Sequence, residues 1–125
     1  MSEKSNKKID RRVFPRFEYL ECAMIYAPNL ADPIRTMVVD IGIGGLQLRS
    51  KEGVPVGELL EVHIGRDENP PLRVKGYARF SQLIDDGENL YVTGFKFSPR
   101  THEERAAIAQ YVHDVFTRQW NIMAG

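Results

Sequence analysis

The sequence predicts a mainly β domain, a six-stranded antiparallel β-barrel followed by one C-terminal α-helix. Three observations predict this fold class. Apolar and polar residues alternate at a period of two between residues 20 and 97, turn-forming residues interrupt the alternation at hairpin-like intervals, and the apolar period changes to three and four after Pro99. A chain of 125 residues has room for one domain with one core.

The first half of the chain carries three predicted strands. Alternate apolar side chains share one face of the first strand, namely Leu20, Cys22, Met24 and Tyr26. Turn residues at 28–33 end this strand, and the second strand, 37–39, runs directly into Asp40. After a glycine-rich turn, Leu46 and Leu48 alternate with polar residues in a third strand with one buried face.

The second half carries strands at 60–64, 72–83 and 90–97. Gly76 predicts a bend or bulge in the longest of them. The run Asp-Asp-Gly-Glu at 85–88 is the strongest hairpin signal in the chain, and it joins the last two strands.

A helix follows, because Thr101 with Glu104 fits a capping box. Its core-facing stripe repeats at three and four residues: Ile108, Tyr111, Val112 and Val115. Phe116 and Trp120 lie beside the stripe or beyond it, and we expect them to cover the barrel rim rather than remain exposed as a partner contact. The helix should close one opening of the barrel.

Charge is balanced overall but not along the chain. Equal numbers of basic and acidic side chains, 17 each, argue against a general nucleic-acid binder or a membrane-surface binder. Residues 1–16 nevertheless carry six basic side chains (Lys4, Lys7, Lys8, Arg11, Arg12, Arg16) against two acidic ones (Glu3, Asp10). We therefore predict a flexible anion-attracting arm at 1–10, a domain at 11–120 and a short tail at 121–125.

Cysteine usage and hydrophobicity bear on the compartment. The single cysteine, Cys22, cannot form an internal disulfide or a thiolate metal site and is expected to be a small core residue. No apolar run approaches the ~20 residues that cross a bilayer, and residues 1–9 lack the apolar segment of a signal peptide. These features favour a cytoplasmic protein without membrane insertion.

Two short motifs carry the chemistry. Arg12 and Arg16 lie four positions apart on a segment that Pro15 keeps out of helix, and their planar guanidinium groups suit guanine edges and phosphates. Asp40, entering the glycine-rich turn, offers the acceptor that the ring N–H and amino group of guanine need. Gly44 and Gly45 let backbone approach a ligand closely. The two motifs together fit a guanine nucleotide.

This pair of motifs resembles those of the PilZ domain family, Arg-x-x-x-Arg followed by [Asp/Asn]-x-Ser-x-x-Gly, and the similarity runs from about Arg11 to the end of the helix. The resemblance implies a PilZ-like barrel that binds the second messenger cyclic di-GMP. It assigns ligand binding to Arg12, Arg16, Asp40 and Gly45.

Two positions qualify the resemblance. Gly42 stands where the family has serine, so a hydroxyl expected to contact the ligand is missing. Arg11 precedes the motif, and in the family an arginine there accompanies two intercalated ligand molecules per protomer. The resemblance therefore implies two ligands per chain, with Arg11 and Gly42 as further site residues.

Catalytic and metal chemistry find no support in the sequence. The three histidines, His63, His102 and His113, lack metal-ligand spacing and an evident partner set. Neither Ser81 nor Ser98 lies in a nucleophile elbow. No lysine and no helix follow the glycines, which excludes a phosphate-binding Walker loop. We expect no enzyme, no cofactor and no metal.

We expect the protein to be a receptor whose arginine-rich arm becomes ordered when cyclic di-GMP binds, and which signals through an unidentified effector protein. Two alternatives remain. One is a PilZ-like adaptor that has lost nucleotide binding, which Gly42 makes credible. The other is a binder of single-stranded nucleic acid, which would need stacking aromatics on a basic face, whereas the aromatics here mostly alternate into the predicted core. The oligomeric state stays open.

Overall fold

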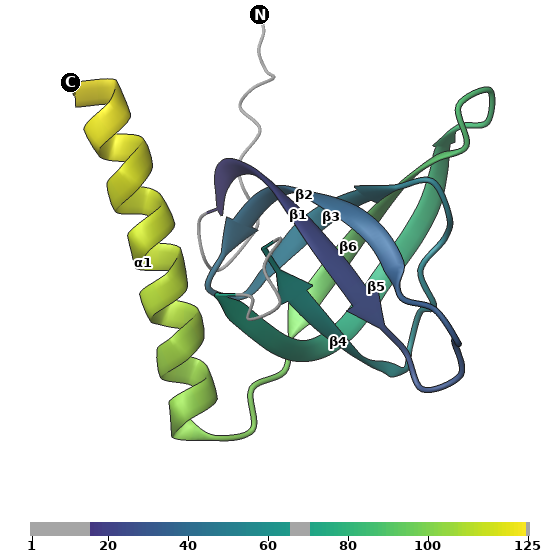
Figure 1. Cartoon of the computed structure of the whole chain (residues 1–125), viewed down its shortest axis with the longest axis horizontal. Coiled ribbons are helices and arrows are strands. Elements are labelled where there is room, and N and C mark those ends of the chain that lie inside the picture. Colours follow the sequence, from purple (N-terminus) through teal and green to yellow (C-terminus); the bar gives the residue numbers. More distant parts are fainter. Residues whose placement is uncertain (1–15, 66–70, 125) are drawn as a thin grey trace, which may run out of the picture.

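The computed structural model describes residues 16–65 and 71–124, and these residues form six strands and one helix (Figure 1). The elements are β1 (Arg16–Tyr26), β2 (Ile34–Gly42), β3 (Gly45–Ser50), β4 (Leu59–Ile64), β5 (Leu72–Asp85), β6 (Leu90–Phe97) and α1 (His102–Ala124). The strands close into a barrel in the order β1-β2-β3-β6-β5-β4, with antiparallel pairing throughout that order. The predicted fold class is confirmed.

The core fills the barrel interior, because alternate side chains of each strand point inward. The largest fully buried side chains are Phe95, Ile25, Ile41, Leu46, Leu48, Leu60 and Ile64. The α1 stripe predicted from the sequence belongs to the same cluster of buried residues. Figure 1 shows α1 lying against one end of the barrel, where β1 and β3 begin and β2 ends.

The face of β1 that points into the barrel is the opposite of the one that carries Leu20, Cys22, Met24 and Tyr26. Ala23 and Ile25 are fully buried, whereas Leu20 is 73% exposed and Tyr26 is exposed. The free thiol of Cys22 lies on this outer face and is half-buried, so it is not a core residue. The cause is that both faces of β1 are apolar, and a narrow barrel accepts a side chain as small as Ala23 on its inner face.

The irregularities of β5 do not lie at Gly76. A Cβ at Gly76 would collide with the carbonyl oxygen of Lys96 and with the ring of Phe95, so this glycine is needed for the close approach of β5 and β6. Two register shifts against β6 come later, between Ala78 and Phe80 and between Leu83 and Asp85. Each inserts one extra residue into β5, as a β-bulge does.

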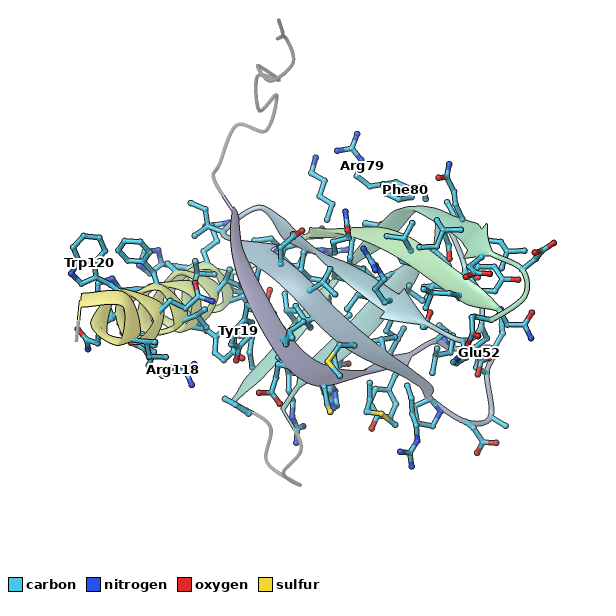
Figure 2. The ribbon with its side chains drawn as sticks, turned by 90° about the horizontal axis from the view of Figure 1, so that it is seen from above. Tyr19, Glu52, Arg79, Phe80, Arg118 and Trp120 are labelled. Atoms are coloured by element: carbon cyan, nitrogen blue, oxygen red, sulfur yellow. The ribbon has the colours of Figure 1, made fainter. Side chains whose placement is uncertain are left out.

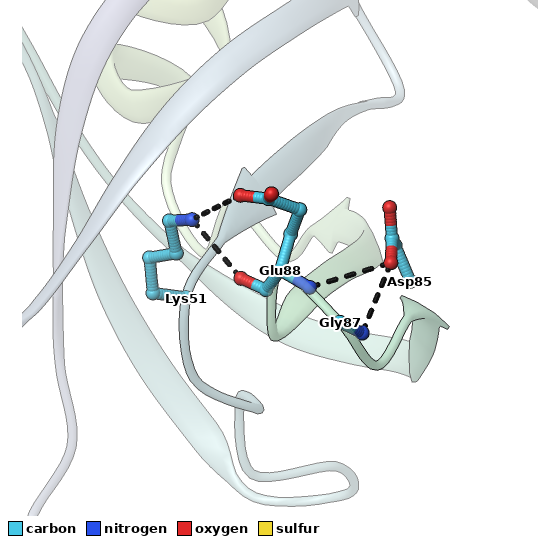
Figure 3. A network of polar contacts seen from close by, with 4 residues as sticks. All are labelled: Lys51, Asp85, Gly87 and Glu88. Atoms are coloured by element: carbon cyan, nitrogen blue, oxygen red, sulfur yellow. Dashed lines mark hydrogen bonds and ion pairs between the residues drawn. The ribbon is translucent and has the colours of Figure 1, made fainter.

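The predicted hairpin between β5 and β6 is confirmed, and Figure 3 shows its contacts. Asp85 Oδ1 accepts hydrogen bonds from the backbone N–H groups of Gly87 (3.1 Å) and Glu88 (3.3 Å). Lys51 Nζ donates to the carbonyl oxygen of Glu88 (3.0 Å) and lies 3.6 Å from its carboxylate. Asn89 completes the turn with a φ of 53°, a conformation that asparagine tolerates well.

The helix begins at the predicted cap. The N–H of Glu104 donates to Thr101 Oγ1 (3.0 Å), and Glu104 Oε1 accepts from the N–H of Arg100 (2.6 Å). The helix continues to Ala124, so positions 121–124 of the predicted tail are helical. Within the described part of the chain, no helix has the length and hydrophobicity to cross a membrane.

The expectation that Phe116 and Trp120 cover the barrel rim is wrong. Phe116 is 42% exposed and Trp120 is 58% exposed. Their rings stack on each other, with centroids 6.4 Å apart. Each residue advances about 100° around a helix, so Phe116 lies about 100° away from the buried Val115 and Trp120 follows one turn later on that side. The pair therefore flanks the core-facing stripe.

Candidate functional site

The backbone brings the two predicted motifs to one end of the barrel. Arg16 is the first residue of β1 and pairs with Gly42, the last residue of β2. Glu18 pairs with Asp40 two positions further along. Gly45 opens β3 after the turn. Residues 1–10, Arg11 and Arg12 lie outside the described residues, so the predicted arm and two of the three site arginines are not part of this geometry.

Asp40 is turned outward by an irregularity in β2. Val38 and Ile41 are both fully buried, and the pairing with β3 shifts between Val38 and Asp40. The extra residue lets two inward positions stand three apart, with Asp40 half-buried on the outer side between them. Its cross-strand partner on β3 is Gln47. The carboxylate therefore belongs to the outer surface of the sheet.

The glycines of the motif have different structural reasons. A Cβ at Gly45 would collide with the backbone carbonyl oxygen of Phe95, so glycine is required where β3 approaches β6. Gly42 is a paired strand residue, and among the described glycines those with positive φ are Gly57 and Gly65. Gly42 therefore has a backbone conformation that other residues can adopt.

The sheet next to the motif carries residues that the sequence pattern did not single out. Outward positions in register with Asp40 continue across β3, β6 and β5 as Gln47, Gly94 and Phe80. The neighbouring outward row holds Gly45, Lys96 and Tyr77. Tyr77 and Phe80 are both exposed, contrary to the expectation that aromatics alternate into the core. The signal available in the sequence was Gly94, because glycine within a strand indicates a bulge or a close approach.

A separate groove of about 830 Å³ lies between β1 and α1, and the described residues lining it include none of the predicted site residues. The hydroxyls of Tyr19 and Tyr111 share a hydrogen bond of 2.6 Å in this groove. The guanidinium carbon of Arg118 lies 5.9 Å from the centroid of the Tyr19 ring. Burial, and then the hydrogen bond with Tyr19, raises the pKa of Tyr111 far above its ordinary value. These contacts join the helix to the barrel.

The histidines occupy surface or boundary positions. His63 Nε2 lies 2.9 Å from a carboxylate oxygen of Glu61, and its ring packs against Tyr26 with centroids 4.4 Å apart. His102 and His113 are exposed on α1. Over residues 16–65 and 71–124, no group of three or more His, Cys, Asp or Glu side chains is arranged to hold a metal ion.

Comparison with known proteins gives a family and a set of similar folds. The sequence matches the family described as "PilZ domain" over residues 10–114. No curated protein sequence matches the chain.

Among solved structures, the PilZ domain of YcgR from Escherichia coli with c-di-GMP is similar at a TM-score of 0.69 and 12% identity, over 92% of this chain and 98% of that one. The K. pneumonia MrkH–c-di-GMP complex gives 0.68 and 16% over 90% of this chain, and the Bacillus subtilis inhibitor of motility MotI/DgrA gives 0.62 and 21% over 94%. The matched region spans 56% of each of these last two chains.

Proposed function

The chain belongs to the PilZ domain family, whose members are receptors for cyclic di-GMP, and we propose that it binds cyclic di-GMP through Arg12, Arg16 and Asp40 without catalysing a reaction. The carboxylate of Asp40 accepts hydrogen bonds from the N1–H and N2 amino group of one guanine. The guanidinium groups pair with guanine acceptors and with the phosphates.

One observation carries this proposal, the pairing of Arg16 with Gly42 at the ends of adjacent strands. The arginine-rich segment that ends at Arg16 continues directly into β1, the strand that pairs with β2 at Asp40. Gln47, the cross-strand partner of Asp40 on β3, adds a half-buried polar side chain to the same outer surface. These are the groups that recognition of a planar base and a phosphate requires.

Output follows from ordering of the arm. The ligand neutralises the basic side chains of residues 1–16 and fixes that segment against the barrel, which creates a surface that a protein partner recognises. The effector is unidentified. The B. subtilis chain of similar fold is an inhibitor of motility, and we include motility among the processes that this output serves.

Calorimetric titration of the purified chain with cyclic di-GMP tests the proposal. An arginine contact to guanine contributes ~1–3 kcal/mol, so Arg16→Ala should weaken binding about tenfold or more. Arg35→Ala is the matched control, because Arg35 is exposed at the opposite end of β2, and its affinity should equal that of the unmodified chain. Equal affinity for GTP or cyclic di-AMP would contradict the specificity.

The same titration reports stoichiometry. We expect two ligands per chain, and one ligand per chain in Arg11→Leu. An unmodified chain that saturates at one ligand, with no change in Arg11→Leu, removes the intercalated pair from the proposal.

A nucleotide-free adaptor is the second candidate function, and Gly42 is the observation that favours it. Without a hydroxyl at this position the ligand loses one hydrogen bond, which is worth ~0.5–1.5 kcal/mol. A chain that gives no heat with high-micromolar cyclic di-GMP is such an adaptor.

A further inference from the structure

Phe80 holds an unusual position on the outer surface of the barrel. Its ring occupies the space where a side chain of Gly94 would begin, since ring atoms Cζ and Cδ2 lie 2.8 and 3.1 Å from the site of a Cβ on Gly94 and Cε2 lies closer still. Gly94 is buried even though it faces outward, while Phe80 remains 38% exposed. One side of the ring thus rests on bare backbone, and only part of the ring is open to solvent.

A bulge directs Phe80 to this surface. Every second residue of β5 from Leu72 to Ala78 is buried, so strict alternation would also place the side chain of Phe80 in the core. The register shift between Ala78 and Phe80 inserts Arg79 opposite a single step of β6, and a shift of one residue exchanges the two faces of a strand. Arg79 and Phe80 are consequently both exposed.

The surroundings of Phe80 suit an anionic ligand with a planar base. Arg79 is adjacent in sequence, and Lys96 is exposed on the same outer face of β6, two residues or about 7 Å beyond Gly94. Figure 2 shows Arg79 and Phe80 projecting from the barrel, well separated from Tyr19 and Arg118 at the helix. An aromatic ring flanked by two cations is the combination that binds a base by stacking and its phosphate by charge.

The same register connects Phe80 to the candidate nucleotide site. Asp40, Gln47, Gly94 and Phe80 form one outward row across β2, β3, β6 and β5. Three interstrand spacings of ~4.8 Å separate its ends, about 14 Å along the sheet. Gly94 leaves the floor between Gln47 and Phe80 without a side chain of its own.

We propose that Phe80, seated on Gly94, is a base-stacking subsite for the second guanine of cyclic di-GMP, while Asp40 binds the edge of the first. The inference rests on the proposed function. Arg79 and Lys96 supply positive charge for the phosphates between the two bases. Phe80 contributes affinity through its ring, and base identity is read at the Asp40 end.

Calorimetry with two independent variants tests the subsite. Phe80→Leu keeps an apolar cover over Gly94 but removes the ring, and it should weaken cyclic di-GMP binding about tenfold. Gly94→Ala leaves Phe80 in the sequence but displaces its ring, and it should weaken binding to a similar extent. Tyr26→Leu is the matched control, because it removes an exposed aromatic ring that packs on His63, and its affinity should not change.

Fluorescence gives a readout that a purely structural role would not produce. Trp120 is the only tryptophan, so Phe80→Trp combined with Trp120→Phe places the single indole at the subsite. Cyclic di-GMP should quench this indole with the midpoint seen by calorimetry. Trp120 in the unmodified chain should change little at the same ligand concentrations.

The outcomes separate the subsite from the function on which it rests. Absence of heat with the unmodified chain overturns both. A second outcome overturns the subsite alone: the unmodified chain binds cyclic di-GMP, Phe80→Leu and Gly94→Ala bind it with the same affinity, and the indole at position 80 is not quenched. A lower melting temperature in those variants would then assign Phe80 to packing. A third outcome is salt-dependent binding of an oligothymidylate that is abolished in Phe80→Leu while the affinity for cyclic di-GMP stays unchanged. That result assigns the ring to nucleic-acid binding and also overturns the proposed subsite.

Discussion

Gly42 is the residue at which two physical effects of opposite sign meet. A serine here offers the ligand one hydrogen bond, a net gain of ~0.5–1.5 kcal/mol. A Cβ at a position with positive φ would cost ~1–2 kcal/mol. Gly42 is a paired strand residue and is not one of the described glycines that have a positive φ. The gain should therefore exceed the cost.

We predict that Gly42→Ser binds cyclic di-GMP about three- to tenfold more tightly than the unmodified chain. Calorimetry measures the affinity, and thermal melting should show unchanged or slightly raised stability. Gly45→Ser is the matched control, because a Cβ there collides with the carbonyl oxygen of Phe95 and should lower the melting temperature. Weaker binding together with a lower melting temperature in Gly42→Ser would contradict the prediction.

Single residues also show where sequence reasoning succeeds and where it stops. Thr101 and Glu104 were predictable as a helix start, because a cap depends on side chains within one turn of chain. The exposure of Phe80 was not, since it depends on a bulge whose position is set by pairing with a strand more than ten residues away. Asp40 was predictable as a strand-end carboxylate, whereas the position of Gln47 beside it and of Phe80 further along the same row required the register.

At the scale of elements, α1 is joined to the barrel by a mixed contact. Val115 and Ile108 are buried against the core, and the Tyr19–Tyr111 hydrogen bond closes the contact at its polar side. The raised pKa of Tyr111 means that the folded protein disfavours the ionised phenol. An unfolded chain releases that proton near pH ~10, so stability from this group is present below pH ~10 and is lost as pH rises above it.

We predict that the free energy of unfolding falls above pH ~10 and falls less steeply in Tyr111→Phe, which has no proton to release. At neutral pH the same variant should be about 1 kcal/mol less stable, because Tyr19 loses its partner. Urea denaturation between neutral pH and pH ~11 measures both effects. Tyr26→Phe serves as the control on an exposed tyrosine, and parallel pH profiles for all three chains would contradict the assignment to Tyr111.

Element type was predictable from periodicity, but the phase of an element was less so. All six strands and the helix were expected, and the buried helical stripe was correct residue by residue. The prediction of which β1 face points inward was wrong. Both faces of this strand carry apolar side chains, so the alternation identifies a strand but does not show which face is buried. The exposure of Phe116 and Trp120 was missed because both lie beside the buried stripe, on a flank of the helix whose contact with the barrel depends on how α1 is placed against it.

At the scale of the whole molecule, charge separation couples ligand binding to the arm. The chain is neutral overall, yet residues 1–16 hold six of its basic side chains and two of its acidic ones. An anionic ligand at the β1–β2 end therefore attracts this segment in preference to the rest of the chain.

We predict that amide hydrogen exchange across residues 7–16 slows when cyclic di-GMP is added. Peptides from β4 report the barrel and should not change, and at a subsaturating ligand concentration Arg16→Ala should show less slowing than the unmodified chain. Full protection of residues 7–16 in the ligand-free protein would mean that the signal is not carried by ordering of the arm.

The bulges of β5 have a consequence for association with other chains. A closed barrel pairs its strands on both sides, but within the described residues β5 beyond Ser81 is paired with β6 alone. Before that point the segment 54–56 lies beside β5, since Val56 bridges Ala78 and the N–H of Val54 donates to Ser81 Oγ. A strand paired on one side is an open edge onto which a foreign strand can add. The second bulge, between Leu83 and Asp85, interrupts the row of free N–H and C=O groups, and the acidic turn that follows repels an approaching chain at that end. The hairpin can thus expose Leu83 and Ile84 to solvent without offering a template for sheet extension.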